Sequence, residues 1–174
     1  HVHIFNGKAF LFSSHDYGPG QSNYRMDDWQ LFSSDDLLNW KLEFVLKPED
    51  TYLKKCQECY ATDGAERNGK YYFYFSEQQR STGVAVADRP EGPFVDARGK
   101  TPILPKGITP TNSYDPDIIL PDEDDPNAYI LFGSDWTDHY WAMQLDRNMV
   151  DVVPGTARKV PVYPADGTPT EPLG

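Results

Sequence analysis

One pattern occurs three times along the chain and constrains its fold more than any other feature. It is a turn followed by an aromatic-rich strand that ends in small polar residues. The three copies are Asn6–Ser14, Asn68–Ser76 and Pro126–Ser134. Aligning Lys8, Lys70 and Asn127 gives spacings of 62 and 57 residues. Repeats of this length, each with several short strands, are typical of β-propeller blades.

The rest of the sequence also favours an all-β fold. Almost no segment shows a 3.6-residue apolar period, and short β-rich runs alternate with Gly, Pro, Asn and Asp. Each repeat divides into four predicted strands: His1–Phe5, Lys8–Ser13, Trp29–Ser33 and Trp40–Leu46 in the first; Tyr60–Glu66, Lys70–Ser76, Gly83–Ala87 and Phe94–Ala97 in the second; Ser113–Leu120, Ala128–Gly133, Tyr140–Leu145 and Ala157–Tyr163 in the third.

These strands predict three four-stranded blades. Their approximate bounds are residues 1–47, 57–105 and 112–164, with 165–174 as a connector to a further blade. Propellers usually close with about four to eight blades. Three blades leave open strand edges, which proteins avoid. We therefore expect the chain to be part of a larger ring, or to complete its ring by pairing with another copy as a homo-oligomer.

The composition indicates which classes of binding partner the chain favours. The 174 residues hold 16 Lys and Arg against 27 Asp and Glu, a net charge of −11. This balance argues against nucleic acid and against anionic lipid as partners. No apolar run approaches the roughly 20 residues of a membrane helix. Aromatic residues reach 14%. Many aromatic rings beside many carboxylates fit carbohydrate binding, and an aromatic β core explains them equally well.

The two cysteines form a single Cys-x-x-Cys pattern at Cys56 and Cys59. A structural zinc site needs four ligands, and no second pair exists in the sequence. A thioredoxin-like motif would open a helix, and the residues after Cys59 do not have a helical pattern. We expect ordinary thiols or a local disulfide, and the pair does not decide the cellular compartment.

Four stretches, in order and spacing, resemble glycoside hydrolase family 43, whose members are five-bladed β-propellers. They are Ser33–Trp40 (SSDDLLNW), Asn68–Ser76 (NGKYYFYFS), Gly83–Phe94 (GVAVADRPEGPF) and Tyr114–Asp117 (YDPD). Each alone is a weak signal. Together they extend the resemblance over nearly the whole chain.

The resemblance implies an inverting glycosidase that acts on arabinose- or xylose-containing plant polysaccharides or oligosaccharides, as an α-L-arabinofuranosidase or a β-xylosidase. In this chemistry a carboxylate base activates water and a carboxylic acid protonates the leaving oxygen, about 6.5–9.5 Å apart. A third acid tunes the pKa of the general acid. The alternative is a non-catalytic carbohydrate-binding propeller, or a partial propeller that oligomerises. No cofactor is expected; a central calcium is known in parts of the family, but this sequence does not specify one.

By the same resemblance, Asp115 is the pKa-tuning and orienting acid, although an Asp before Pro is also a common turn pairing. Asp63 lies where the family shows a Trp-Ala-Pro-Asp-like run, so it holds a sugar hydroxyl or shapes the pocket; a turn Asp is the alternative. The family's base is expected just before His1, and its general acid beyond Gly174. Glu171 is interpreted as a linker residue.

Further site candidates follow from blade topology. If the first strands begin at the active face, the loops from second to third strands rim the pocket. Those loops are His15 to Asp28, Glu77 to Thr82 and Asp135 to His139. The predicted substrate-binding residues in or beside them are Asp27, Trp29, His15, Glu77, Trp136 and His139. Each of these is also explained as a solvated loop residue, and no metal ligand is predicted.

Overall fold

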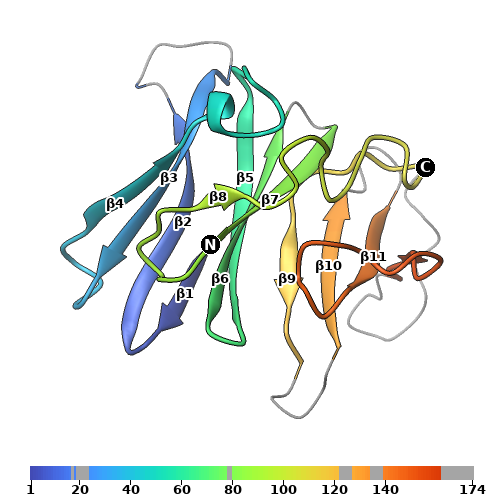
Figure 1. Cartoon of the computed structure of the whole chain (residues 1–174). Coiled ribbons are helices and arrows are strands. Elements are labelled where there is room, and N and C mark those ends of the chain that lie inside the picture. The colour runs from blue at the N-terminus through green and yellow to red at the C-terminus, as the bar shows by residue number, and fades with distance from the viewer. Residues whose placement is uncertain (17, 19–23, 78–79, 122–126, 134–138, 162–174) are drawn as a thin grey trace, which may run out of the picture.

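The computed structural model describes residues 1–16, 18, 24–77, 80–121, 127–133 and 139–161. These residues form three four-stranded antiparallel sheets. Within each sheet, strands adjacent in the sequence are hydrogen-bonded neighbours, and the sheets follow one another in chain order across Figure 1. The prediction of an all-β chain with three four-stranded blades is confirmed. Among the described residues, no helix is long and apolar enough to cross a membrane.

Sheet 1 is built from the first repeat. It contains β1 (Val2–Phe5), β2 (Lys8–Asp16), β3 (Met26–Ser34) and β4 (Lys41–Leu46). Asn6 and Gly7 join β1 to β2 with φ angles of 53° and 79°. Two consecutive positive φ angles define the hairpin turn for which Asn-Gly is the preferred pair. The repeated Asn-Gly of the sequence is therefore a hairpin signal.

Sheets 2 and 3 repeat this arrangement. Sheet 2 contains β5 (Cys59–Arg67), β6 (Lys70–Glu77), β7 (Ser81–Ala87) and β8 (Val95–Asp96). Sheet 3 contains β9 (Asp117–Ile119), β10 (Ala128–Gly133), β11 (Tyr140–Leu145) and β12 (Arg158–Lys159). The Asn68-Gly69 turn between β5 and β6 again has two positive φ angles, 56° and 71°.

The predicted strand Ser113–Leu120 is much shorter in the structure, where β9 covers Asp117–Ile119. Asp115 has a φ of 53°, which is incompatible with an extended strand, and Pro116 has no N–H to donate to a ladder. The predicted strand Ala157–Tyr163 is also short, because β12 covers Arg158–Lys159 within the part of this segment that is described.

The Ser33–Trp40 stretch is a turn between β3 and β4 that its own side chains hold together. The Asp36 carboxylate accepts hydrogen bonds from the N–H groups of Asn39 and Leu38 at 2.8 and 2.9 Å. The Ser34 hydroxyl accepts the N–H of Leu37 at 2.8 Å. The hydrogen bonds to the Asp36 carboxylate, above all that from the Asn39 N–H, lower the pKa of Asp36. The motif thus has a structural explanation as a capped turn.

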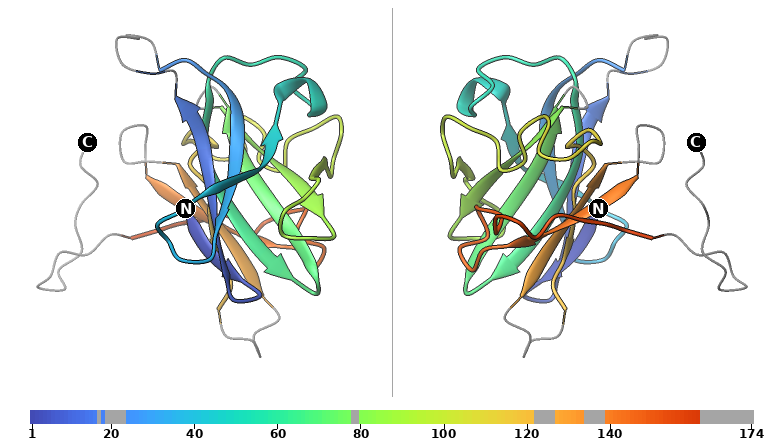
Figure 2. Two further views of the ribbon diagram at one scale, coloured as in Figure 1. Left: turned by 90° about the vertical axis from the view of Figure 1, so that its left-hand side faces the viewer. Right: turned by 90° about the vertical axis from the view of Figure 1, so that its right-hand side faces the viewer.

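Aromatic side chains fill the spaces between the sheets. Phe12 and Trp29 of sheet 1 pack with Phe73 and Phe75 of sheet 2 in one buried cluster. A second cluster joins sheets 2 and 3 through residues such as Tyr74. Much of the aromatic content is therefore core. In the two side views the sheets overlap (Figure 2), and the 3-10 turn Pro48–Asp50 lies near the top of the molecule, as it does in Figure 1.

Candidate functional site

A recess of about 330 Å³ lies where the end of β2 and the starts of β3 and β5 meet the turn before β9. Its lining residues are Ser14, Tyr24, Met26, Tyr60, Ala61, Tyr114 and Asp115. Each of the three sheets therefore contributes to one hollow. Convergence of this kind was expected from the blade topology, and it brings Asp115 together with three tyrosines.

Asp115 sits on a turn that is fixed on its N-terminal side. The carbonyl of Tyr114 accepts the N–H of Gly133 at 2.8 Å, and the carbonyl of Ser113 accepts the Thr82 hydroxyl at 2.8 Å. The left-handed φ of Asp115 costs roughly 1 kcal/mol for a residue other than glycine. Surrounding protein atoms desolvate its carboxyl and raise the pKa of Asp115, although the residue is still exposed to solvent.

Three tyrosines line the recess: Tyr24, Tyr60 and Tyr114, of which Tyr114 is buried. Burial, together with the nearby Glu58 carboxylate, raises the pKa of Tyr60, so its hydroxyl remains a donor at neutral pH. Tyr24 is largely exposed. Tyr24 lies in the predicted rim loop His15 to Asp28, and the sequence did not predict that Tyr60 or Tyr114 would line the site. The available signals were the adjacency of Tyr114 to Asp115 and the place of Tyr60 in the Trp-Ala-Pro-Asp-like run.

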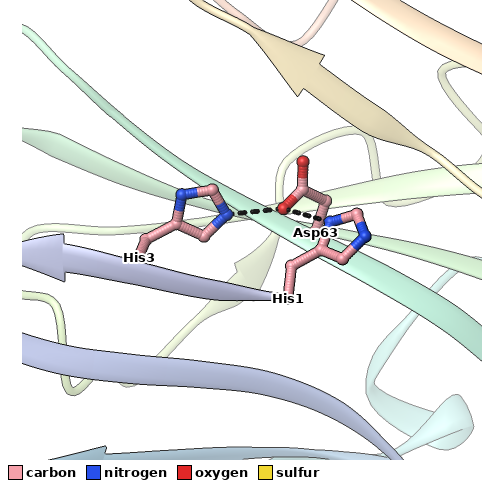
Figure 3. A group of neighbouring side chains, drawn as sticks. All are labelled: His1, His3 and Asp63. Carbon is pink, nitrogen blue, oxygen red and sulfur yellow. Dashed lines mark hydrogen bonds and ion pairs between the residues drawn. The ribbon is translucent and has the colours of Figure 1, made fainter.

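Asp63 is the most enclosed carboxylate of the candidate set, with 0% of its surface exposed. Its Oδ1 atom lies 2.6 Å from His3 Nε2 and 2.8 Å from His1 Nδ1, as Figure 3 shows. Oδ1 also accepts the N–H of Gly64 at 2.8 Å, and Oδ2 accepts the N–H of Ile118 at 2.6 Å. Both oxygens are thus occupied by protein groups, so the geometry favours the second half of the prediction for Asp63, a role in shaping the site.

The pKa of Asp63 follows from these contacts. Burial alone would raise it, because a charged carboxylate loses its hydration. The hydrogen bonds from His3, Ile118 and Gly64, together with the charge of His3, outweigh that effect and lower the pKa of Asp63 below its ordinary value. The carboxylate is therefore ionised at neutral pH.

His1, His3 and Asp63 are also the three described residues whose ligand atoms lie close enough together to consider a metal ion. Tetrahedral zinc with bonds near 2.0–2.1 Å separates its ligand atoms by about 3.3 Å. The 2.6 and 2.8 Å separations here are those of direct hydrogen bonds. Calcium prefers about six to eight oxygen ligands, and this group supplies a single carboxylate. The arrangement fits a hydrogen-bonded network better than either metal site.

The structure corrects the prediction for Trp29. It was predicted to contact substrate, but none of its surface is exposed, and its ring lies 4.7 Å from that of Phe75. Its indole N–H donates to the carbonyl of Tyr60 at 2.8 Å. When protein covers both faces of a strand end, the sequence does not show which of its side chains point toward the site and which point into the core. Trp29 supports the recess by holding Tyr60 in place.

Two other predicted residues face protein groups. Glu77 is buried at the β6–β7 hairpin, where its carboxylate accepts the Ser81 hydroxyl at 2.7 Å. Asp27 forms an ion pair with Arg25 at 3.0 Å and lines a different cavity, of about 390 Å³, that borders Cys56. The structure does not bring either residue into the recess with Asp115.

The histidine candidates lie at strand ends. His15 Nδ1 is 2.8 Å from Asp28 Oδ1, and the ring is partly exposed. His139 is half-buried just before β11. Trp136 and Glu171 lie outside the described residues.

The family comparison agrees with the resemblance. The model of glycosyl hydrolases family 43 matches residues 8–169. The xylosidase/arabinosidase 43A of Humicola insolens is 35% identical over 166 residues, which cover 86% of this chain and 47% of that protein. A xylosidase/arabinosidase of Bacteroides ovatus is 32% identical over 78% of this chain and 42% of that protein. The chain thus spans less than half the length of either relative.

Solved structures give the same result. A family 43 enzyme from Xanthomonas citri, complexed with xylotriose, superposes with a TM-score of 0.77 at 27% identity and covers 99% of this chain and 57% of that one. An α-L-arabinofuranosidase from Clostridium thermocellum gives a TM-score of 0.69 at 27% identity and covers 93% of this chain and 56% of that one.

Proposed function

The chain belongs to glycosyl hydrolase family 43, and we propose on this premise that the protein hydrolyses β-xylosidic or α-L-arabinofuranosidic bonds with inversion. The names of its relatives support this choice of sugars. The observation that carries the proposal is the position of Asp115, whose carboxyl opens on a tyrosine-lined recess built from all three sheets. Xylose- or arabinose-containing oligosaccharides are the proposed substrates.

In this mechanism Asp115 acts on the general acid and does not attack the sugar. A negative charge beside a carboxylic acid raises the pKa of that acid, so the acid stays protonated until it donates to the leaving oxygen. Tyr24, Tyr60 and Tyr114 supply ring faces on which the C–H surface of a sugar packs. The Tyr60 hydroxyl, whose proton bonds to the Glu58 carboxylate, can accept a hydrogen bond from a sugar hydroxyl. Partial burial strengthens the charge interaction and the hydrogen bond by excluding water.

The test is an assay of the full-length protein on 4-nitrophenyl β-D-xyloside, α-L-arabinofuranoside and β-D-galactoside. Release from the xyloside or the arabinofuranoside is expected. We expect Asp115→Asn to reduce kcat about 100-fold or more, because it removes the charge and keeps the shape. Asp35→Asn is the matched control, since Asp35 is a highly exposed acid on the β3–β4 turn.

Absence of hydrolysis of all three substrates by folded protein would contradict the proposal. If xylotriose still quenches the intrinsic fluorescence of that inactive protein, the non-catalytic carbohydrate-binding alternative is favoured. Equal activity losses in Asp115→Asn and Asp35→Asn would remove Asp115 from the mechanism.

We propose that hydrolysis needs no cofactor, because proton transfer between carboxyl groups and water is sufficient chemistry for it. Dialysis against EDTA should then leave the rate unchanged, and recovery of a lost rate by calcium alone would contradict this.

We also propose that this chain, if it exists alone, pairs with a second copy; elution as a monomer in sizing chromatography would contradict that proposal.

A further inference from the structure

The turn that carries Asp115 is fixed on its C-terminal side by one carboxylate. Ile118 lies three residues beyond Asp115, in the middle of β9, opposite Ile130 of β10. Its N–H points away from β10 and donates to Asp63 Oδ2 at 2.6 Å. Ile118 is buried, so without this acceptor its N–H would be left unpaired in the protein interior.

The turn needs such a fixed point. Asp115 holds a left-handed φ of 53°, and Pro116 cannot donate a backbone hydrogen bond. A residue in that conformation persists only when its surroundings determine it. The hydrogen bonds of Ser113 and Tyr114 hold the chain before Asp115, and the bond from Ile118 to Asp63 holds the chain after it.

Asp63 is in turn held by sheet 1. It lies in β5, which contacts β1, β2, β3 and β9. His3 of β1 reaches its Oδ1 atom at 2.6 Å, and the His3 ring is itself fixed by stacking on Phe5 with centroids 5.8 Å apart. His1 approaches the same oxygen from a half-exposed position (Figure 3). One carboxylate therefore connects sheet 1 to the Asp115 turn of sheet 3.

We propose that Asp63 is a positioning residue, which His3 orients and which sets the place of the Asp115 carboxyl in the recess. The proposal rests on the proposed function for its kinetic consequence, but its structural part does not. Displacement of a reacting or tuning group by about 1 Å can cost on the order of 100-fold in rate. Asp63 thereby influences hydrolysis from a buried position.

The variants are Asp63→Asn, His3→Ala and His3→Gln. Asp63→Asn keeps the shape but turns an N–H₂ group toward one of the N–H donors. His3→Ala removes the ring, and His3→Gln restores a side-chain N–H that can reach Asp63. Ser33→Ala is the matched control. It also removes a partly buried hydrogen bond to a carboxylate, the 2.7 Å bond from the Ser33 hydroxyl to Glu43, but this bond lies within sheet 1.

The first readout needs no substrate. Amide hydrogen exchange at Ile118 and the carboxyl ¹³C resonance of Asp115 are measured by NMR in each folded variant. We expect Ile118 to exchange at least about 10-fold faster, and the Asp115 resonance to move, in Asp63→Asn and His3→Ala. We expect no such change in Ser33→Ala. Unchanged signals in the first two variants would overturn the proposal.

The second readout is kinetic, on 4-nitrophenyl β-D-xyloside and α-L-arabinofuranoside. We expect kcat to fall about 10- to 100-fold in Asp63→Asn and His3→Ala with little change in KM, and to recover in His3→Gln. Equal losses in His3→Ala and Ser33→Ala would reduce His3 to a structural role and overturn the proposal. If Asp63→Asn does not fold, the His3 pair decides. A wild-type protein without activity refutes the proposed function, and the NMR comparison still decides the positioning role.

Discussion

The hydroxyl of Tyr74 shows how a single atom can join two sheets. The ring is completely buried in sheet 2, and its hydroxyl donates to the carbonyl of Met149, beyond β11, at 2.7 Å. Tyr74→Phe should lower the free energy of unfolding by about 1–3 kcal/mol, because the buried carbonyl loses its donor. Urea denaturation measures the change. Tyr72→Phe, on the same strand, should cost less; equal costs would show that the Met149 bond contributes nothing.

The two thiols differ in environment although they are three residues apart. Cys59 is completely buried, whereas Cys56 is only partly buried. A hydrogen bond from Cys59 lowers the pKa of Cys56, and the same contact, with burial, raises the pKa of Cys59. Since the thiolate is the nucleophile, iodoacetamide should alkylate Cys56 first. Mass spectrometry of time-quenched peptides checks the order, and earlier labelling of Cys59 would contradict it.

At the scale of the strand, Gly64 allows β5 to lie against β2. A Cβ atom at this position would be 2.2 Å from Cε2 of Phe12 in the core between sheets 1 and 2. Gly64→Ala should therefore destabilise the protein by about 1–3 kcal/mol or more through overpacking. Gly18→Ala is the control, because a Cβ there meets nothing within 4 Å and the φ is not positive. Similar melting temperatures for the two variants would show that Phe12 moves aside easily.

The strands show which parts of the fold are readable from sequence. Asn-Gly turns and aromatic runs are local signals, so strands such as β2 and β6 were predicted within a few residues of their ends. The predicted length of β9 was too great, because the left-handed conformation of Asp115 depends on contacts with Thr82 and Gly133, which are distant in sequence. Local patterns do not reveal such contacts.

The candidate site was readable only in part for the same reason. The Tyr114–Asp117 motif pointed to Asp115, and this residue lines the recess beside the starts of β3 and β5. The burial of Trp29 and Asp63 could not be predicted, because both lie where one sheet covers another. Tyr60 and Tyr114 enter the lining through the same packing. Residues at the junctions of sheets are thus the ones that sequence alone leaves undetermined.

For the whole molecule, the bonds of Asp63 predict a pH dependence of stability. Its pKa is lowered in the folded state, so its contribution is fully present above the unfolded value of about 4 and is lost as the pH falls through the folded value. The free energy of unfolding should therefore decrease from about pH 5 to about pH 3. Asp63→Asn should be less stable at pH 5 and should show a shallower decrease. Parallel curves for both proteins, from urea titrations, would contradict this.

The chain order of the strands has a consequence for synthesis on the ribosome. Every hydrogen-bonded strand pair within the three sheets joins strands that are consecutive in the sequence. Each sheet can thus form from residues that emerge together, without waiting for a distant partner, and such local pairing carries a small loop-closure entropy. The hydrogen bonds that Asp63 accepts from His3 and from the Ile118 N–H then follow as each new sheet appears. Folding from the N-terminus, sheet by sheet, is the order that this topology permits during translation.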